Sequence, residues 1–414
     1  MEIGSRHINK NLLTLLLTVF LDFLGFGLII PIIAPILLDP INGVLHQGYG
    51  YSSRTVILGF LIAAFPIAQF FGAPILGSLS DKYGRKKILL VSIFMTSISL
   101  LLFGIGVSTR NLFLLFFSRF LNGLMGGNVS TAQSAIADMS DLQSKAKNFG
   151  LMGMMFGLGF ILGPFFGGKL ADPHVASWFN FSTPFWVAGS LSMINVLLIS
   201  AWFKETLKMS RDTVHLNFGT GIRNIRRAFS SSSLRTIFTV SFLTIFGFNA
   251  FTQFFQVYLI TKFQYNQAQI GILYAYMGFW IVVAQGGFVR VLSNKYHPGK
   301  ILRVSIIVLS ISIMVLLFPN APSGIYFILP FVSLAQGVTT PNIITIISNS
   351  AGVHDQGEIL GINQSVQAVG FAVPPILAGL ISTLDYRLPI IMGSLFVVTA
   401  WLIHIYFFRE HHEV

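Results

Sequence analysis

Long apolar segments separated by short polar breaks follow one another along almost the whole chain. A helix needs about 20 predominantly apolar residues to cross a bilayer, and segments of this length satisfy their backbone hydrogen bonds as helices rather than as barrel strands. The pattern predicts an all-α integral membrane protein with twelve transmembrane helices. The twelve segments lie near residues 12–38, 56–78, 88–107, 112–137, 148–170, 183–203, 235–260, 269–291, 300–319, 324–349, 358–382 and 387–408.

The longest polar segment lies between the sixth and seventh predicted helices and divides the chain into two halves. Residues 1–203 and 234–414 would each hold six helices, and residues 204–233 would form a cytoplasmic linker. Within this linker apolar positions (Phe218, Ile222, Ile225 and Phe229) follow helical spacing, and arginines (Arg223, Arg226 and Arg227) occupy other positions. Such a pattern is typical of an amphipathic helix on an anionic membrane surface. The alternative is a solvated linker whose periodicity arises by chance.

The two halves repeat each other in sequence. The segment "SLSDKYGRKKILLVS" (78–92) aligns with "VLSNKYHPGKILRVS" (291–305), with nine of fifteen positions identical. A second alignment places three glycines and a proline of residues 150–168 on Gly361, Gly370, Gly379 and Pro375. Two pseudo-symmetric halves of six helices are a transporter architecture, in which the substrate site lies between the halves near the middle of the membrane.

The composition agrees with a membrane protein, and the distribution of charge predicts its orientation in the membrane. Only 10% of residues are charged and 54% are hydrophobic, whereas a soluble domain has about 25% charged residues. The net charge of +12 could suggest nucleic acid, but most lysines and arginines fall on the side of the membrane that holds the N-terminus. This is the positive-inside asymmetry, which predicts that both termini are cytoplasmic, so no nucleic-acid partner is needed.

Two further features narrow the picture. The first apolar run is too long for the hydrophobic region of a signal peptide and should remain as the first helix. The chain contains no cysteine, which excludes disulfides, thiolate nucleophiles and cysteine metal sites.

The segment "GSLSDKYGRKK" (77–87) concentrates charge in an otherwise apolar chain. Gly77 and Gly84 permit close approach and tight turning, and Asp81 can meet the positive end of a helix and pair with Arg85. Three basic residues, Arg85, Lys86 and Lys87, hold this loop on the cytoplasmic side. The alternative is that all these charges only set the topology.

A glycine-rich segment, "GLMGMMFGLGFILGPFFGG" (150–168), lies in the fifth predicted helix. Three of its glycines recur every four residues and form a smooth face that lets another helix approach closely, and Pro164 can bend the helix at that contact. A packing role alone is the alternative. The glycines and proline of this segment are Gly150, Gly159, Gly163, Pro164, Gly167 and Gly168.

Two charged residues, Asp22 and Arg119, lie deep within predicted spans. Arg119 in "RFLNGLMGG" shares a face with Gly123 and Gly127, and an arginine inside a span marks a functional site by default. Its expected partner is Asp22, which lies about halfway through the first span. A conformational change that alters the distance between the two groups would change the proton affinity of the carboxylate, which predicts proton coupling. A static buried ion pair is the alternative.

Polar residues in the second half are candidates for substrate binding. Amides and aromatic rings bind flat, amphipathic solutes by hydrogen bonding and stacking. The alternative role for each of these residues is a hydrogen bond between helices. The candidates are Asn249, Gln253 and Gln256 in the seventh helix, Tyr274 in the eighth, and Gln364 and Gln367 in the eleventh.

These motifs carry a resemblance to a known family. Residues 77–87 resemble motif A of the major facilitator superfamily (MFS), "RFLNGLMGG" resembles motif B, and residues 150–168 resemble motif C of the twelve-helix drug/proton antiporters. With "LDFLGFGLIIPIIAPIL", "SAIADMSDLQSKAKNFG" and "DQGEILGINQS", the chain resembles the tetracycline/proton exporters. The resemblance implies the MFS fold, drug export, and a motif A latch that joins the two halves on the cytoplasmic face in the outward-open state.

The chain departs from the tetracycline exporters in one respect. The eighth and ninth predicted helices contain no histidine or acidic residue near mid-membrane, although such groups take part in coupling in that group of exporters. Asp22 is therefore the expected proton carrier.

The function expected from the sequence is a proton-driven antiporter that exports amphipathic small molecules or drugs through a bacterial inner membrane. It would use the proton gradient without cofactor or metal, contact membrane lipid and act as a monomer. An uptake symporter or facilitator for a metabolite or siderophore is the alternative. An enzyme is not expected, since no nucleophile has an evident base and no histidines have metal-binding spacing. A receptor without transport activity would leave Asp22 and Arg119 unexplained.

Overall fold

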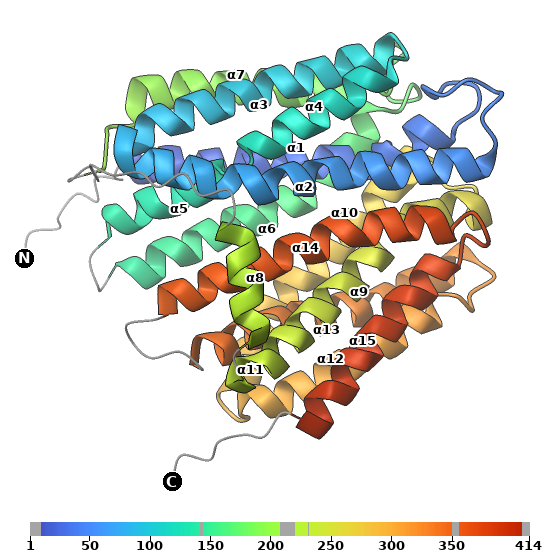
Figure 1. The fold of residues 1–414 in the computed structure, drawn as a ribbon. Coiled ribbons are helices and arrows are strands. Elements are labelled where there is room, and N and C mark those ends of the chain that lie inside the picture. The colour runs from blue at the N-terminus through green and yellow to red at the C-terminus, as the bar shows by residue number, and fades with distance from the viewer. Residues whose placement is uncertain (1–9, 141–143, 208–219, 231, 350–355, 408–414) are drawn as a thin grey trace, which may run out of the picture.

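The computed structural model describes residues 10–140, 144–207, 220–230, 232–349 and 356–407, which form a bundle of long helices with short connections (Figure 1). The helices before the linker are α1 (Lys10–Leu38), α2 (Tyr51–Tyr83), α3 (Arg85–Ser108), α4 (Leu112–Met125), α5 (Asn128–Asp138), α6 (Lys145–Leu170) and α7 (Thr183–Trp202). The linker helix is α8 (Thr220–Ser230). The helices after it are α9 (Ser232–Phe263), α10 (Gln267–Val283), the π-helical turn η1 (Ala284–Phe288), α11 (Val289–Ser293), α12 (Pro298–Val315), α13 (Pro322–Asn349), α14 (Gln356–Ile381) and α15 (Leu388–Phe407).

Twelve helical segments of the described chain are long and apolar enough to cross a membrane, which confirms the predicted number of spans. Two of these spans are not single regular helices. The fourth consists of α4 and α5 with a break at Gly126 and Gly127, and the eighth passes through η1. The adjacent glycines weaken the fourth span because they lose more backbone entropy in a helix than other residues do. The Gln69 amide donates to the carbonyl of Gly126 at 3.0 Å, so protein atoms satisfy the irregular backbone.

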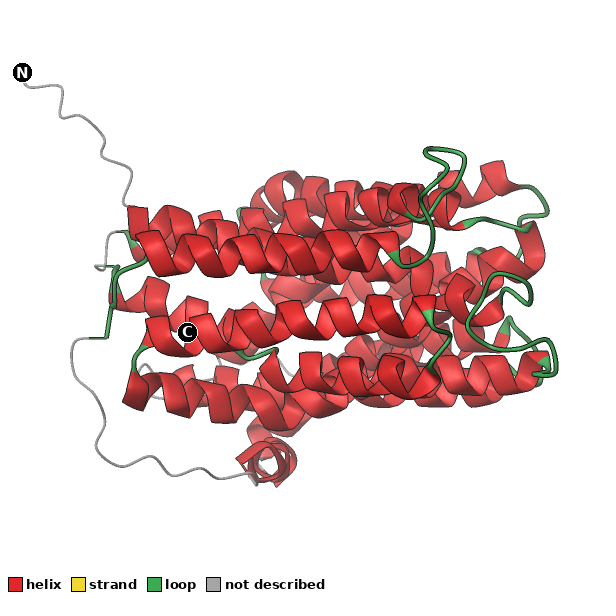
Figure 2. Ribbon diagram, turned by 90° about the horizontal axis from the view of Figure 1, so that it is seen from above, coloured by secondary structure: helices red, strands yellow, loops and turns green. Residues whose placement is uncertain are grey.

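The bundle has two ends, which we name by the chain segments that they carry. The terminal face holds the start of α1, the end of α7 and the loop between α2 and α3. The opposite face holds the connections at residues 39–50, 171–182, 264–266 and 382–387, which lie together at the right of Figure 2.

The linker helix α8 runs across the second-half helices instead of parallel to them (Figure 1) and packs against α9 and α14. Ala228 is fully buried, and the Asn224 amide donates to the Ser365 hydroxyl of α14 at 3.2 Å. The three arginines of this helix are exposed. The predicted linker helix is therefore present, and it packs mainly on the second half, with a smaller contact to α2. Phe218 lies outside the described residues.

Buried apolar clusters fill both halves, and the cluster around α1 continues to Phe254 and Val257 of α9 and Ala378 of α14. In the second half large side chains of α9 are fully buried, among them Phe238, Phe251 and Tyr258. In the first half the outer part of α1 packs with Phe103 of α3 and Phe185 of α7, whose rings stack at 4.3 Å between centroids. Burying an aromatic or large aliphatic side chain contributes about 1.5–3 kcal/mol in water, and in a membrane the same close packing supplies van der Waals contact between helices.

The halves meet at a crossing of α2 and α14 near the opposite face. A Cβ atom placed on Gly59 of α2 would overlap the carbonyl oxygen of Pro375 and would lie 3.2 Å from the Cα of Gly379. Only glycine allows the two backbones to approach this closely.

A second crossing, between α6 and α10, repeats this arrangement. A Cβ atom on Gly271 of α10 would overlap the carbonyl oxygen of Pro164 and would lie 3.2 Å from the Cα of Gly168. Pro164 and Gly168 are the residues that align in sequence with Pro375 and Gly379 of the first crossing. The sequence repeat therefore produces two similar helix crossings that hold the halves together near the opposite face.

Candidate functional site

A cavity of about 300 Å³ lies inside the first half, close to the second half. Its wall is predominantly apolar, with a few polar groups, which is the usual composition of a small-molecule site. Phenylalanines that line it are Phe23, Phe26, Phe65, Phe156 and Phe160. The polar residues from the first half are Asp22, Gln69, Thr96, Arg119, Asn122, Asn128 and Ser192, and the second half contributes Gln253 and Phe371.

Asp22 lies on α1 at the wall of this cavity and is half-buried. The Asn128 side-chain amide donates to the Asp22 Oδ2 at 2.8 Å. Asn128 is the first residue of α5, directly after the glycine break, and its Oδ1 accepts from the backbone N–H of Val129 at 2.8 Å. The interruption of the fourth span therefore directs an amide toward the carboxylate.

Arg119 lies on α4 and is 5% exposed. Its Cζ lies 5.1 Å from the centroid of the Phe65 ring of α2, a cation–π contact. Its Nε has no hydrogen-bond partner among the described residues. The guanidinium reaches this ring because α4 lies close to α2 at Gly123, where a Cβ atom would be 2.7 Å from the Cβ of Ala68.

The expected contact between Asp22 and Arg119 is absent from this structure. Both residues line the cavity, but the ion pairs within the described part of the chain do not include one between them. The physical reason is that Asn128 binds the carboxylate, while the guanidinium stacks on Phe65. The sequence correctly placed both charges in one internal region and was wrong about their pairing in this state.

The structure brings one of the six predicted substrate residues into the cavity, Gln253. The other two amides of this stripe make structural hydrogen bonds. Asn249 donates to the Ile245 carbonyl of its own helix at 2.9 Å, and Gln256 accepts from the backbone N–H of Ala34 in α1 at 3.2 Å. The latter bond joins the two halves.

The remaining three predicted substrate residues also lie outside the cavity wall. Tyr274 donates to the Thr252 carbonyl of α9, Gln364 is exposed and Gln367 is half-buried. The sequence did not identify the uncharged polar residues from α2, α3, α4, α5 and α7 that line the cavity. Their only signal was an uncharged polar side chain inside an apolar span, for example Asn128 beside a glycine pair.

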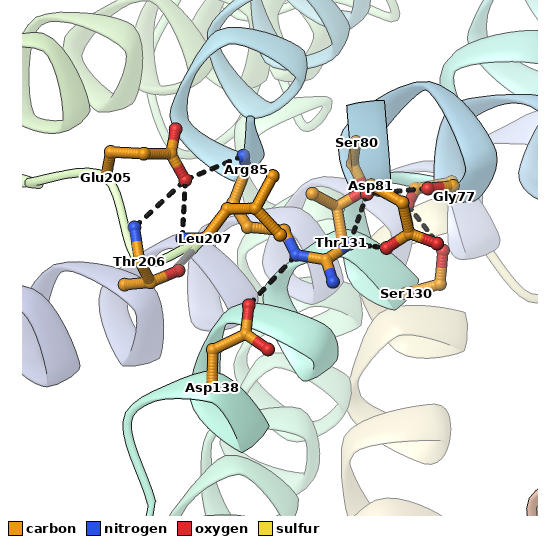
Figure 3. Close-up of polar contacts among 11 residues, drawn as sticks. Gly77, Ser80, Asp81, Arg85, Ser130, Thr131, Asp138, Glu205, Thr206 and Leu207 are labelled. Atoms are coloured by element: carbon orange, nitrogen blue, oxygen red, sulfur yellow. Dashed lines mark hydrogen bonds and ion pairs between the residues drawn. The ribbon is translucent and has the colours of Figure 1, made fainter. Parts of the chain in front are cut away.

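The charged segment 77–87 forms a compact network on the terminal face (Figure 3). Arg85 is buried, and its Nη1 contacts the Asp81 Oδ1 at 2.6 Å as predicted. The Nε of the same guanidinium binds Asp138 at the end of α5 at 3.0 Å. These contacts brace α2, α3 and α5 within the first half, so the described network does not itself form a latch between the halves.

Glu205, beyond the end of α7, completes this network. Its carboxylate accepts from the backbone N–H groups of Arg85 at 2.9 Å and Lys86 at 3.0 Å, the first residues of α3. Burial alone would raise the pKa of Glu205, but hydrogen bonds from backbone N–H groups, including those of Leu207, Lys86 and Arg85, place it below its ordinary value. A carboxylate at a helix N-terminus also interacts favourably with the helix dipole.

Close packing against Glu205 explains why residue 84 is a glycine, but it does not explain the glycine at position 77. Gly84 has φ +99°, and a Cβ atom there would lie 2.5 Å from the Glu205 Oε2. Gly77 lies in α2 with no described atom within 4 Å of such a Cβ. The close approach that we predicted at both glycines is therefore present at Gly84 only.

The smooth glycine face of α6 packs against α1, as the four-residue spacing predicted. A Cβ atom on Gly159 would lie 2.7 Å from the Cβ of Phe23, and one on Gly163 would lie 2.7 Å from the Cα of Gly27. A Cβ on Gly167 would overlap the carbonyl oxygen of Leu28. This contact places the cavity-lining part of α1, including Asp22, next to α6.

Gly150 and Gly168 of the same segment have other surroundings. Gly168 belongs to the crossing with α10, whereas a Cβ atom on Gly150 would have no described atom within 4 Å. The glycine-rich segment thus serves two contacts, one within the first half and one between the halves.

Comparison with known proteins identifies relatives over nearly the whole chain. "Multidrug resistance protein 2" of Bacillus subtilis is 26% identical over 404 residues, covering 96% of this chain and 95% of that protein. "Quinolone resistance protein NorA" of Staphylococcus aureus is 27% identical over 390 residues, covering 93% of each chain.

Solved structures share the fold at low sequence identity. The human organic anion transporter MFSD10 (TETRAN) matches with a TM-score of 0.71 and 20% identity over 97% of this chain and 100% of that chain. A bacterial homologue of the human lysosomal transporter Spinster, in an inward-facing and occupied conformation, matches with a TM-score of 0.75 and 14% identity over 95% of each chain.

The sequence profile of the Major Facilitator Superfamily matches residues 15–375. This match, the twelve membrane-spanning helices and the two repeated helix crossings agree with one another. The chain is a multi-pass membrane transporter that belongs to the Major Facilitator Superfamily.

Proposed function

We propose that this protein is a proton-coupled antiporter that exports amphipathic small molecules by alternating access. The observation that carries the proposal is the cavity with an aromatic wall, a carboxylate at Asp22 and a guanidinium at Arg119 that has no acidic partner in the described chain. The curated relatives, whose names refer to multidrug and quinolone resistance, support an amphipathic drug-like substrate.

Asp22 carries the proton in this mechanism. It is half-buried at the cavity wall, so its charged form is sensitive to how much water and which donors surround it. When the halves move, Gln253 and Phe371 of the second half change position relative to Asp22. The water and the donors around the carboxylate then change, and its proton affinity changes with them. A proton that binds in one state and leaves in the other couples the gradient to transport.

The two glycine crossings act as the closed gate in the state described here. They join α2 with α14 and α6 with α10 near the opposite face, so the cavity exchanges solutes with the terminal face. Opening requires these crossings to separate while the terminal face closes, and the Arg85 network would then become the place where the first half meets the second.

We assign the terminal face to the cytoplasm of a bacterial cell, with the protein in the inner membrane as a monomer. The basic residues of the segment 77–87 belong to the loop between α2 and α3 on this face, in agreement with the positive-inside rule. Export then takes substrate from the cytoplasm or the inner leaflet. Moving one charge through 100 mV is worth about 2.3 kcal/mol, so one proton per cycle can sustain a substantial substrate gradient.

Inverted membrane vesicles with an imposed pH gradient test this function. Addition of an amphipathic drug should dissipate the gradient through the wild-type protein and not through Asp22→Asn. Ethidium and a hydrophobic quinolone are suitable probes, and vesicles without the protein give the background. Labelled solute that exchanges across the membrane without any effect on the gradient would instead indicate a facilitator.

A further inference from the structure

We propose that Arg119 is an anion-binding subsite and that the preferred substrates are planar aromatic molecules with a carboxylate. This inference rests on the proposed function only in taking the cavity as the substrate site. It adds the chemical class of ligand, which the apolar wall alone leaves undetermined.

The first observation is the state of the guanidinium. Arg119 is 5% exposed, and its Nε has no hydrogen-bond partner in the described residues. Phe65 covers one face of the group at 5.1 Å, but a ring face accepts no bidentate hydrogen bonds. A buried charge without an opposite charge is strongly unfavourable. An anionic ligand would supply the opposite charge that Arg119 lacks, and its binding would be favoured for that reason.

The second observation is that the nearest candidate counter-charge is already engaged. The Asp22 carboxylate accepts from Asn128 at 2.8 Å and makes no ion pair with Arg119. A ligand carboxylate therefore does not have to displace an existing salt bridge. Guanidinium groups recognise carboxylates through two parallel N–H···O bonds, and arginine is suited to this geometry.

The third observation is an aromatic wall beside the guanidinium. The ring of Phe65 lies 5.8 Å from that of Phe26, and Phe26 lies 5.8 Å from Phe160. Phe156 continues the wall at 5.0 Å from Phe160. A planar ring system can stack on these side chains while its carboxylate reaches Arg119, so a single rigid aromatic acid satisfies both parts of the cavity.

The test compares two ligands of nearly equal shape, 2-naphthoate and 2-naphthamide, which differ in charge. Their binding to the purified full-length protein in detergent, followed by naphthalene fluorescence at pH 7.5 with no gradient, should show a preference for the carboxylate. A hydrogen bond to a charged group contributes about 1.5–3 kcal/mol, which corresponds to about ten- to a hundredfold in affinity.

Three variants locate this preference. Arg119→Gln should lose at least about tenfold in affinity for 2-naphthoate, while 2-naphthamide changes by less than about threefold, which also shows that the variant is folded. Arg119→Lys should keep part of the preference because it keeps the charge. Asp22→Asn is the control that removes a negative charge instead of a positive one from the cavity wall. It should bind 2-naphthoate as well as the wild type or better.

Three outcomes overturn the inference: neither ligand binds to the wild type, both bind it equally, or Arg119→Gln weakens both to the same extent. The assay contains no proton gradient, so loss of drug-driven proton flux in the vesicle experiment would disprove the antiporter and leave this result intact. Intact flux with equal binding of the two ligands would disprove the anion subsite alone.

Discussion

At the scale of single residues, the functional groups are distinguished by how their polar atoms are satisfied. Asp22 has a neutral donor, Asn128, and Arg119 has a ring but no acceptor for its Nε among the described residues. Arg85, in contrast, binds two carboxylates, those of Asp81 and Asp138. A satisfied arginine stabilises structure, whereas an unsatisfied one in a cavity is available to a ligand.

Gly84 offers a stability prediction at this scale. Gly84→Ala should lower the melting temperature in detergent, because alanine is strained at φ +99° and its Cβ would lie 2.5 Å from the Glu205 carboxylate. Such backbone strain costs about 1–3 kcal/mol. The matched control is Gly77→Ala in the same segment, where the Cβ meets no described atom within 4 Å, and its melting temperature should be unchanged or slightly higher. Equal melting of the two variants would contradict this account of Gly84.

Glu205 gives a pH-dependent prediction. Because its pKa in the folded protein is lower than its ordinary value, its stabilising effect is fully present above the unfolded pKa of about 4.3 and is lost as the pH falls through the folded pKa. Glu205→Gln should therefore melt at a lower temperature than the wild type at pH 7, and the difference should shrink below about pH 4.3. A difference that stays constant as the pH falls well below the unfolded pKa, to about pH 3, would show that the charge of Glu205 is not the stabilising factor.

At the scale of elements, α6 connects the site to the gate. Its face with Gly159, Gly163 and Gly167 packs on α1, which carries Asp22, and its Pro164 and Gly168 pack on α10 of the second half. A movement of α6 against α10 therefore also changes the surroundings of α1. This is the mechanical link that proton coupling requires.

Substitution on this face tests the packing. Gly163→Ala should destabilise the protein by about 1–3 kcal/mol, the usual cost of overpacking, because a Cβ there would lie 2.7 Å from the Cα of Gly27. Gly150→Ala on the same helix is the control, since it meets no described atom within 4 Å. Both are measured as thermal unfolding in detergent, and a loss of stability in Gly150→Ala alone would contradict the assigned face.

Sequence reasoning was most successful where a single physical rule dominates. The twelve spans could be predicted because each contains enough apolar residues to cross a bilayer, and Asp22 and Arg119 because a charge in an apolar span is conspicuous. The break after Met125 was missed because residues 112–137 were predicted as one span, with Gly123 and Gly127 assigned to one face of a continuous helix.

Uncharged polar residues could not be assigned in the same way. An amide inside a span has the same signature whether it bonds its own helix, as Asn249 does with Ile245, or faces a cavity, as Asn122 does. The role of Glu205 was also hidden, because its partners are backbone N–H groups about 120 residues earlier in the chain. These distinctions depend on tertiary contacts.

At the scale of the whole molecule, the two crossings describe one state of an alternating-access cycle. Both lie near the opposite face and use equivalent glycines and prolines of the two halves. The proposed cycle therefore moves the halves as two bodies around the cavity, with the crossings separating together.

Accessibility of the cavity tests this arrangement. The chain has no cysteine, so Gln253→Cys introduces a single thiol at the cavity wall. A membrane-impermeant maleimide should label it faster in inverted vesicles than in right-side-out vesicles, because the opposite face is closed. The added substitutions Gly59→Ala and Gly271→Ala should raise labelling in right-side-out vesicles by loosening the crossings. Faster labelling of the single variant from the outside would contradict either the closed face or the orientation.

The most direct test of the central claim measures what Asp22 does in purified protein reconstituted into liposomes. Asp22→Asn should still exchange labelled substrate for unlabelled substrate across the membrane, because the cavity and the crossings remain, but it should not accumulate substrate against its gradient when a pH gradient is imposed. Asp22→Glu keeps the carboxyl group and should retain part of the accumulation. Accumulation by Asp22→Asn at the wild-type level would contradict the assignment of Asp22 as the proton carrier.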